Sequence, residues 1–177
     1  TCNFPIRNLS DMKGAKIRVV PSDLYQQLFT AFGAAATPMA FSEVPTALIT
    51  NVIDGQENPY SVIVSSALYE VQKYCMETNH LPTNHGLWMN RNTYESLTPE
   101  QQEAVLKAAY DASAYMDKYI LDKVEEYKKI CEDNGMEIID AENGLDIDGF
   151  KAAAENVYDY FAEDWGDMPD LIRAVQP

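Results

Sequence analysis

The sequence predicts an α/β fold, and three of its features lead to that prediction. Short apolar runs at residues 15–20 and 136–139 have the length and composition of strands. Between residues 98 and 134, apolar side chains recur at helical spacing without interruption. The remaining stretches alternate between strand-like and helix-like patterns, and a chain in which strands alternate with helices usually folds as an α/β protein.

The first predicted strand carries a single cation and leads into the first predicted helix. Residues 15–20 form this strand, and Arg18 interrupts its apolar run. Ser22 can cap the helix that follows. The apolar positions of this helix keep helical spacing as far as Gly33, a residue type that commonly follows the end of a helix.

A second extended segment and a second helix follow. Residues 38–41 suggest the extended segment, and a helix is expected to start at Ser42, to tolerate Pro45 in its first turn and to end at Gly55. Residues 61–68 are ambiguous between strand and helix, because they are rich in β-branched residues. Residues 69–76 and 86–89 are predicted as strands.

The second half of the chain is dominated by one long helix. Thr98 is followed by a proline and, three residues later, by Gln101, which is the capping-box arrangement. The helical pattern continues to residues 134–135, Asn-Gly, where it stops. A helix of roughly 35 residues would extend about 50 Å, so we expect it to span two lobes of the protein.

The C-terminal part is predicted to contain one strand and two helices. Residues 136–139 form the strand. Asp146 or Asp148 can cap a helix from about residue 150 to residue 161, and a shorter helix is expected after Pro169.

Composition limits the classes of partner. The chain has 177 residues, 46% of them hydrophobic, which is enough for a substantial core. Its formal net charge of −15 argues against binding to nucleic acids or to anionic membrane surfaces. No run of 18 apolar residues is present, and residues 1–7 do not read as a secretory signal. A processed chain would look the same, so this start does not indicate the cytosol.

Metal, cofactor and catalytic motifs are not found in the sequence. Cys2, Cys75 and Cys131 share no metal-ligand spacing, and any one disulfide among them would leave a free thiol. With only His80 and His85 as histidines, a zinc site is not expected, and we predict buried, inert thiols. Phosphate-binding loops, nucleophile elbows and zinc-protease motifs are missing, so we predict neither a cofactor nor an enzyme.

Arg18 is the strongest candidate for a binding residue. An unpaired guanidinium in the middle of an apolar strand would be costly, so Arg18 needs an anionic partner. Its planar fork of donors suits a carboxylate held by two parallel hydrogen bonds. Judged from the residues alone, an internal ion pair with one of the 28 acidic residues is the favoured explanation of Arg18.

Four other residues are candidates with ordinary structural explanations. Phe41 in isolation reads as a core residue. Asn58 precedes a proline in a turn, where its amide can either face a cleft or cap the turn. Ser22 is a weaker candidate that can equally be no more than a helix cap, and His80 can be a structural histidine with its hydrogen bonds satisfied.

Five motifs follow one another in the first half of the chain, at residues 11–19, 33–48, 54–59, 70–74 and 78–80. They have the form D-x-K-G-x-K-x-R-V, G-A-x-x-x-P-M-x-F-x-E-V with a following A-L pair, D-G-Q-E-N-P, E-V-Q-K-Y and T-N-H. This ordered set resembles one family, the solute-binding proteins of tripartite ATP-independent periplasmic (TRAP) transporters, of the DctP type. One departure is Pro45, where the family often has tyrosine, which is expected to shift the first turn of that helix.

The resemblance implies roles for the candidate residues. Arg18 falls at the position of the family's carboxylate-binding arginine, and Phe41 at that of the aromatic residue that packs on the ligand. Asn58 matches an amide that hydrogen-bonds the ligand, and His80 a histidine near the polar end of the pocket. Ser22 is a weaker candidate for the same site.

The resemblance also implies a two-lobed periplasmic-binding-protein fold with the long helix spanning both lobes. Family members are much longer at the N-terminus, so the chain is expected to be the C-terminal part of such a protein, lacking most of the first lobe. Three segments are expected: residues 1–83 as the ligand-binding segment of the second lobe, residues 84–123 as a return segment belonging to the first lobe, and residues 124–177 as a helical segment packing on both. An oligomer, or association with the missing segment, is expected to cover the exposed surface.

The implied function is capture of a small organic acid in the periplasm and its delivery to the TRAP membrane permease subunits. Hinge closure around the bound carboxylate would be the mechanism. Two alternatives stay open at this point. One is a ligand sensor for a signalling receptor, and the other is a truncated remnant that binds nothing.

Overall fold

The computed structural model describes residues 1–82 and 86–175, and a mixed sheet lies at its centre. Three parallel strands run in the order β2 (Ala35–Pro38), β1 (Lys16–Val19) and β3 (Gly55–Gln56). A second parallel pair is formed by β4 (Tyr74–Met76) and β5 (Glu137–Ile139). Cys2 joins the two groups, because it bridges Gly55 on one side and Tyr74 on the other in antiparallel orientation.

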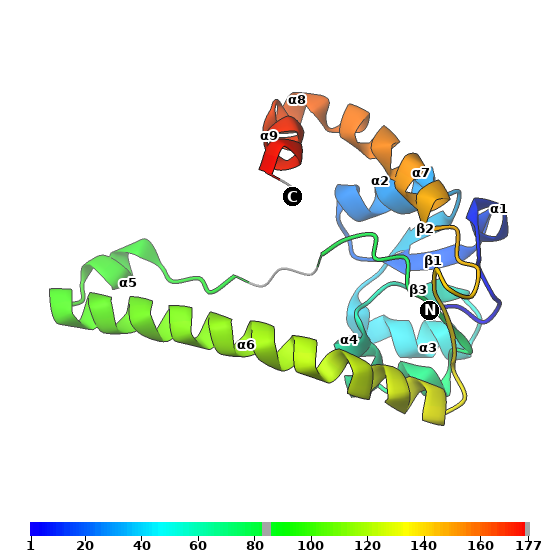
Figure 1. Cartoon of the computed structure of the whole chain (residues 1–177), viewed down its shortest axis with the longest axis horizontal. Coiled ribbons are helices and arrows are strands. Elements are labelled where there is room, and N and C mark those ends of the chain that lie inside the picture. Colours follow the sequence, from blue (N-terminus) through cyan, green and yellow to red (C-terminus); the bar gives the residue numbers. More distant parts are fainter. Residues whose placement is uncertain (83–85, 176–177) are drawn as a thin grey trace.

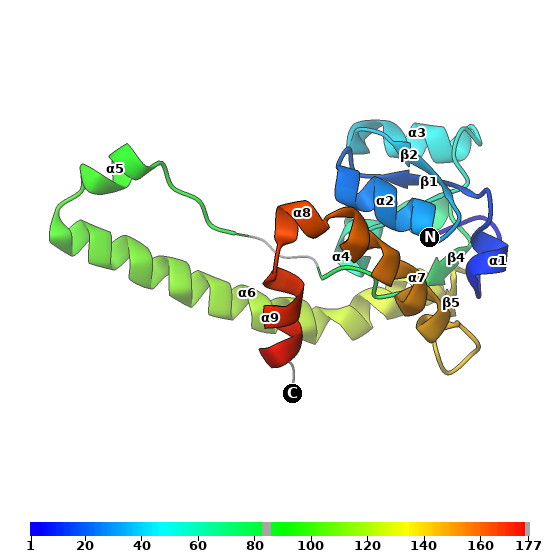
Figure 2. The same ribbon diagram turned by 90° about the horizontal axis from the view of Figure 1, so that it is seen from above.

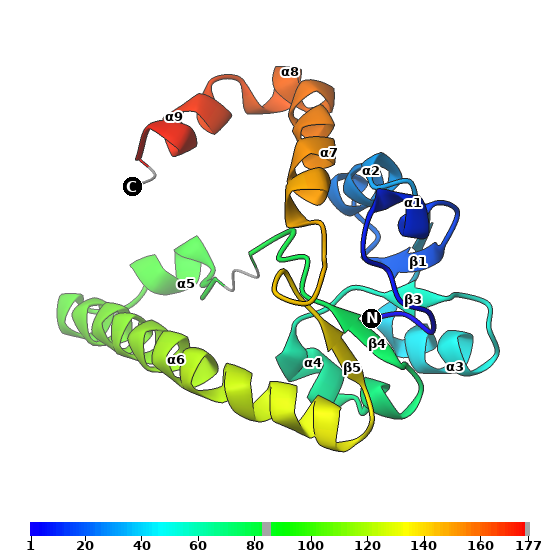
Figure 3. The same ribbon diagram turned by 45° about the vertical axis from the view of Figure 1, so that its right-hand side comes forward.

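Helices cover both faces of the sheet (Figure 3). One face packs against α2 (Asp23–Ala31) and α7 (Ile147–Tyr160), in a core that includes Phe29, Phe32 and Phe150. The other face packs against α3 (Val44–Ile49), α4 (Tyr60–Ser65) and the C-terminal end of α6 (Pro99–Asp133). Neighbouring β5 residues Ile138 and Ile139 belong to opposite cores, as the alternation of side chains along a strand requires.

The long helix α6 has the length and the caps that the sequence predicts. It contains 35 residues. The Thr98 hydroxyl accepts from the Gln101 backbone N–H at 3.3 Å, and the Gln101 side chain accepts from the Thr98 N–H at 2.9 Å. At its other end the chain turns at Gly135, whose φ of +89° strongly favours glycine.

Two long segments project from the sheet (Figures 1 and 2). The N-terminal half of α6 extends away from it and carries α5 (Arg91–Glu95) at its far end. After α7 the chain continues through α8 (Ala162–Trp165) to α9 (Met168–Val175), on the same side of the molecule. Both segments leave large apolar side chains exposed. They include Val105, Leu106, Tyr110, Tyr115, Met116 and Leu121 on α6, and Met168, Leu171, Ile172 and Val175 on α9.

The α/β prediction and most predicted elements are confirmed. The strands expected at residues 15–20 and 136–139 are β1 and β5, and the helix after Ser22 is α2. Asp146, and not Asp148, caps α7, by accepting from the Gly149 N–H at 3.0 Å. The short helix near Pro169 is α9. Two elements were not predicted from the sequence, namely α5 and the single turn α1 (Leu9–Met12).

Several boundaries and types were wrong. The stretch 61–68, which the sequence left open between strand and helix, is helical as far as Ser65 in α4, and Leu68 begins the next turn. Of residues 69–76 only β4 is a strand, after the 3-10 turn η2 (Leu68–Glu70). Residues 86–89 form no strand and are exposed throughout.

The region around Pro38 also differs from expectation. The strand β2 ends at Pro38 instead of starting there, and residues 41–43 form the 3-10 turn η1 (Phe41–Glu43). The following helix α3 has Pro45 in its first turn but ends at Ile49, well before Gly55. It stops there because Asn51, at φ 56°, takes a left-handed conformation that starts the return to β3.

No helix in the described part of the chain combines the length and the apolar character needed to cross a membrane.

Candidate functional site

The parallel strands bring most of the candidate residues to one edge of the sheet. Ser22 follows β1, Phe41 follows β2, and Asn58 follows β3. Because these strands are parallel, their carboxyl ends meet at the same edge, which is where α/β proteins commonly bind ligands. Arg18 lies within the central strand, with Thr37 and Gln56 as its neighbours across the sheet.

Arg18 is a buried cation, only 3% exposed. Its Nε donates to the Met39 carbonyl oxygen at 2.9 Å. Among residues 1–82 and 86–175 no carboxylate oxygen lies within the 4.0 Å of an ion pair with this guanidinium. Burial lowers the pKa of Arg18, and the negative charge of Glu57 acts in the opposite direction. The internal ion pair considered from the sequence is therefore not formed in the described part of the chain.

Phe41 lies over this cation and is not a core residue. The Arg18 guanidinium carbon is 5.6 Å from the centre of the Phe41 ring, within the range of a cation–π contact. The ring is 37% exposed, so the interpretation of Phe41 as an ordinary core side chain is wrong. A residue that begins a turn just after a parallel strand is well placed to present such a ring to a ligand.

Asn58 is held by a chain of amide and hydroxyl groups. Its Nδ2 donates to Gln56 Oε1 at 2.5 Å, and Gln56 Nε2 donates to Thr1 Oγ1 at 2.9 Å. Thr1 Oγ1 in turn donates to Gln72 Oε1 at 2.9 Å. Gln56 and Gln72 are both buried, so this network fixes the orientation of the Asn58 amide from its buried side.

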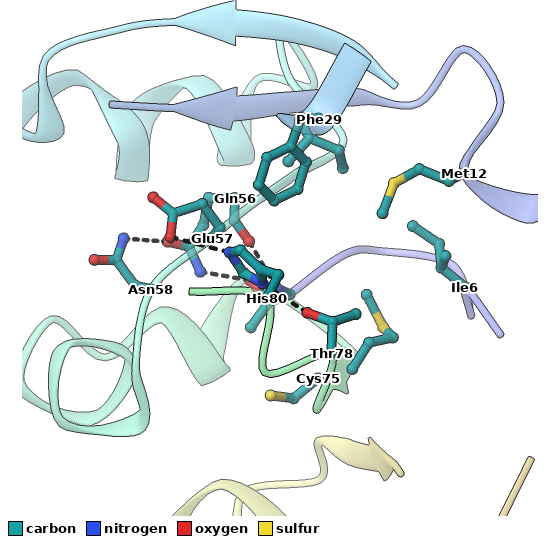
Figure 4. A pocket seen from close by; sticks show the side chains of 12 residues that line it. Ile6, Met12, Phe29, Gln56, Glu57, Asn58, Cys75, Thr78 and His80 are labelled. Carbon is teal, nitrogen blue, oxygen red and sulfur yellow. Dashed lines mark hydrogen bonds and ion pairs between the residues drawn. The ribbon is translucent and has the colours of Figure 1, made fainter. Parts of the chain in front are cut away.

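His80 lies against Glu57 in a hollow at this edge of the sheet (Figure 4). His80 Nδ1 is 2.7 Å from Thr78 Oγ1, and His80 Nε2 is 3.6 Å from Glu57 Oε2. The imidazole also packs edge-on against Phe29, with ring centres 5.1 Å apart. His80 thus has partners on both nitrogens while it lines an open hollow.

The hollow brings some candidates together and leaves others outside it. Asn58 and His80 line it with four other polar residues, and buried side chains of the core close it from the other side. The polar residues are Thr1, Gln56, Glu57 and Thr78, and the core side chains include Ile6, Met12, Ile17 and Phe29. Arg18 and Phe41 form a second group that is not part of its lining. Glu57 connects the two groups, because its charge acts on Arg18 and its carboxylate lies next to His80.

Ser22 fits neither the helix-cap explanation nor the ligand-binding explanation as well as the other candidates fit theirs. It occupies the N-cap position of α2, but its side chain makes no capping hydrogen bond. The side chain is half-buried at the same edge of the sheet. The structure therefore leaves its hydroxyl uncommitted among the described residues.

Four polar residues of the hollow were not singled out as site residues from the sequence: Thr1, Gln56, Glu57 and Thr78. Gln56 and Glu57 stand in the same six-residue run as Asn58, and Thr78 stands two residues before His80. For Gln56, Glu57 and Thr78 the available signal was their place next to predicted candidates at the carboxyl ends of strands. Within the described residues, no three His, Cys, Asp or Glu side chains gather closely enough to hold a metal ion. His85 lies outside those residues.

The three cysteines are buried and unbonded, as predicted. Burial raises the pKa of the Cys75 thiol, and burial together with the nearby Cys75 raises the pKa of Cys131 to about 11. Thiols held in their neutral form in an apolar core are poor nucleophiles and poor metal ligands.

The structure is an α/β unit with a buried cation in the central strand of its sheet. Residues 1–164 match the family described as bacterial extracellular solute-binding protein, family 7. The chain belongs to this family. The family and the structures that resemble the chain are solute-binding proteins, not enzymes.

Individual proteins and solved structures of this family are similar to the chain over nearly its whole length. The chain is 34% identical to the 2,3-diketo-L-gulonate-binding periplasmic protein of Escherichia coli over 97% of its own length and 52% of that protein. A TRAP periplasmic solute-binding protein from Sulfitobacter, solved with β-D-galacturonate, matches with a TM-score of 0.87 at 34% identity. That match covers 96% of this chain and 55% of the Sulfitobacter chain.

A TRAP periplasmic solute-binding protein from Roseobacter denitrificans, solved with L-galactonate, gives a TM-score of 0.81 at 37% identity, covering 89% of this chain and 51% of that one. The chain spans about half the length of the curated relatives it matches.

Proposed function

We propose that this chain supplies the second lobe of a periplasmic solute-binding protein that captures a small organic acid. The observation that carries the proposal is Arg18, a buried cation with no carboxylate ion pair among the described residues. A cation buried in this way needs an anion, and a ligand carboxylate bound by two parallel hydrogen bonds would supply it. Sugar acids are the first class to test, because several similar proteins are described with such acids bound.

Each candidate residue has a part in this proposal. Phe41 packs its exposed ring on the ligand's apolar side, next to the carboxylate on Arg18. Asn58 hydrogen-bonds ligand hydroxyl groups through its side-chain oxygen and its second N–H, since the other N–H already donates to Gln56. His80 forms the polar end of the pocket, and Ser22 offers a hydroxyl that makes no capping hydrogen bond.

The second part of the proposal concerns the two lobes. Residues 1–83 make the ligand-binding part of the second lobe, and residues 84–123 return to the first lobe with the start of α6. Residues 124–177 pack on both. The exposed apolar side chains of α6 and α9 support this arrangement, because large uncovered apolar surfaces mark sites of packing. We call the protein that contains both lobes the two-lobed protein.

Capture would proceed by closure of the two lobes. The carboxylate binds Arg18 first, and closure then excludes water, which strengthens the charge-assisted hydrogen bonds. The closed form makes more contacts with the ligand than the open form does, so ligand binding shifts the population toward the closed form. We further propose that the closed form delivers the acid to the TRAP permease subunits in the membrane.

A thermal-shift screen of the two-lobed protein tests the proposal. Galacturonate, glucuronate, galactonate and 2,3-diketogulonate are compared with neutral sugars of the same size. A ligand at about 100 times its dissociation constant stabilises the folded state by about 2.7 kcal/mol, which such a screen detects. Stabilisation by one of the acids and by none of the neutral sugars is expected, and the reverse pattern would contradict the proposal.

A further inference from the structure

One carboxylate, that of Glu77, joins three separate parts of the lobe. Glu77 Oε1 accepts from the Tyr60 hydroxyl at 2.7 Å. The same oxygen lies 3.0 Å from Lys128 Nζ, and that ammonium is also 3.7 Å from Asp140 Oδ2. Tyr60 is on α4, Glu77 follows β4, Lys128 is on α6 and Asp140 follows β5.

The network touches both segments that carry the polar residues of the hollow. Tyr60 is the first residue of α4 and stands two residues after Asn58. Glu77 stands one residue before Thr78 and three before His80. Backbone bonds hold this second segment, because the Glu77 N–H donates to the Ile139 carbonyl at 2.9 Å. The Asn58 segment and the His80 segment are therefore anchored to the same carboxylate.

Lys128 links that carboxylate to the long helix. It lies in the last turns of α6, where this helix packs against α4 and β5. The side chains of Lys128 and Glu77 are only 22% and 23% exposed. The next residue, Lys129, pairs with Asp133 at 2.9 Å, but those side chains are 71% and 60% exposed. Solvent screens the Lys129 pair strongly and the Lys128 pair much less.

We propose that Glu77 and Lys128 are positioning residues that couple the direction of α6 to the geometry of the ligand site. Neither residue lines the hollow, so each acts through its neighbours: Glu77 through Tyr60 and the Thr78–His80 segment, and Lys128 through Glu77. A change in the direction of α6 relative to the sheet moves or breaks the Lys128 bond. That loss leaves the Glu77 carboxylate without its Lys128 partner and so perturbs both site segments, because Tyr60 hydrogen-bonds the same oxygen and the Thr78–His80 segment follows Glu77 directly. The inference rests on the proposed function, since it concerns the same ligand site.

The first arm of the test needs no ligand. The chain contains two histidines, so the ring signals of His80 can be assigned by NMR with the variant His80→Gln as reference. Lys128→Met keeps the apolar stem and removes the charge, and Lys129→Met is the matched control on the adjacent residue. We expect Lys128→Met and Glu77→Gln to shift the His80 signals, Lys128→Arg to restore them in part, and Lys129→Met to leave them unchanged.

The second arm measures organic-acid affinity by calorimetry in the two-lobed protein. We expect Lys128→Met to weaken binding at least fivefold, about the lower end of couplings between distant sites, and Lys129→Met to leave it unchanged. In the Glu77→Gln background the added effect of Lys128→Met is expected to be much smaller, because both variants break the same link.

The outcomes separate this inference from the proposed function. Lower stability with unchanged His80 signals and unchanged affinity would overturn the inference, because it describes a merely structural ion pair. If the wild-type protein bound no organic acid, the proposed function would fail. The His80 signals would then still decide whether Lys128 positions the site segments.

Discussion

The guanidinium carbon of Arg18 lies 5.6 Å from the centre of the Phe41 ring, although the two residues stand on different elements. Arg18 is in the central strand, and Phe41 follows the neighbouring strand β2. The cation is buried while the ring is partly exposed. The pair thus presents a charge and an apolar face side by side at the sheet edge, an arrangement that suits a ligand with a carboxylate next to a carbon skeleton.

Replacing Arg18 by lysine should weaken binding of organic acids strongly without unfolding the protein. Lysine keeps the charge but lacks the planar fork, so the bidentate pair is lost. The loss should be a few kcal/mol, or about a hundredfold in affinity, measured by calorimetry in the two-lobed protein. The melting temperature of Arg18→Lys serves as the control for folding. Unchanged affinity would contradict the assignment of Arg18 as the carboxylate-binding residue.

Phe41→Ala should weaken binding of every organic acid while costing little stability. A fully buried phenylalanine costs about 3–5 kcal/mol on truncation to alanine, but this ring is partly exposed, so about 1–2 kcal/mol is expected. Denaturant unfolding measures the stability and calorimetry the affinity. A large loss of stability with no change in affinity would show that the ring is structural only.

Asn58→Ala should distinguish ligands by their hydroxyl groups. The variant removes the hydrogen bonds between the Asn58 amide and ligand hydroxyl groups but little apolar contact. Affinity for sugar acids should therefore fall more than affinity for aliphatic acids. Asn58→Asp is a sharper variant, because it replaces the amide by a negative charge near Glu57. Equal losses across a panel of both acid types would show that Asn58 does not read hydroxyl groups.

The sequence was most informative where one local rule decides the structure. The Thr98 capping box and the glycine at 135 predicted both ends of α6, since caps depend on few residues. The stretch 61–68 could not be assigned, because β-branched residues favour strands only when the surrounding sheet receives them. Here α4 instead packs against α6, a contact far away in the sequence.

In the candidate site, too, features that depend on one residue were predictable from the sequence, and features that depend on distant contacts were not. Single residues with unusual chemistry, such as Arg18 in an apolar strand, stand out in the sequence. The Glu57–His80 pair and the four-residue network of Glu77 depend on side chains from distant segments, so no local pattern indicates them. The burial of Phe41 was misjudged in isolation because its exposure depends on the turn after β2.

The chain studied by itself should associate through the exposed faces of α6 and α9. Leu121 is 74% exposed on α6, among other uncovered apolar side chains. Leu121→Glu should reduce association measured by light scattering, whereas Ser113→Glu adds the same charge on the same helix and should reduce it less. A stable monomer of the wild-type chain at 19.9 kDa would contradict this expectation.

Alkaline pH should destabilise the fold partly through Cys131. Burial raises the pKa of this thiol from 9.0 to about 11. Between these values the unfolded chain releases the proton and the folded chain keeps it, so the free energy of unfolding falls as pH rises. A shift of this size corresponds to about 2–3 kcal/mol. Cys131→Ala should therefore show a shallower decline in denaturant unfolding between pH 9 and pH 11, and identical slopes would contradict this assignment.

The most direct test of the account is calorimetry of the two-lobed protein with D-galacturonate and with D-galactose. These sugars share a ring and differ in that one carries a carboxylate where the other carries a hydroxymethyl group. If the acid that binds is of this class, Arg18 predicts measurable binding of galacturonate and affinity for galactose lower by about a hundredfold or more. Equal affinity for the two sugars would contradict the claim that the buried guanidinium holds a ligand carboxylate.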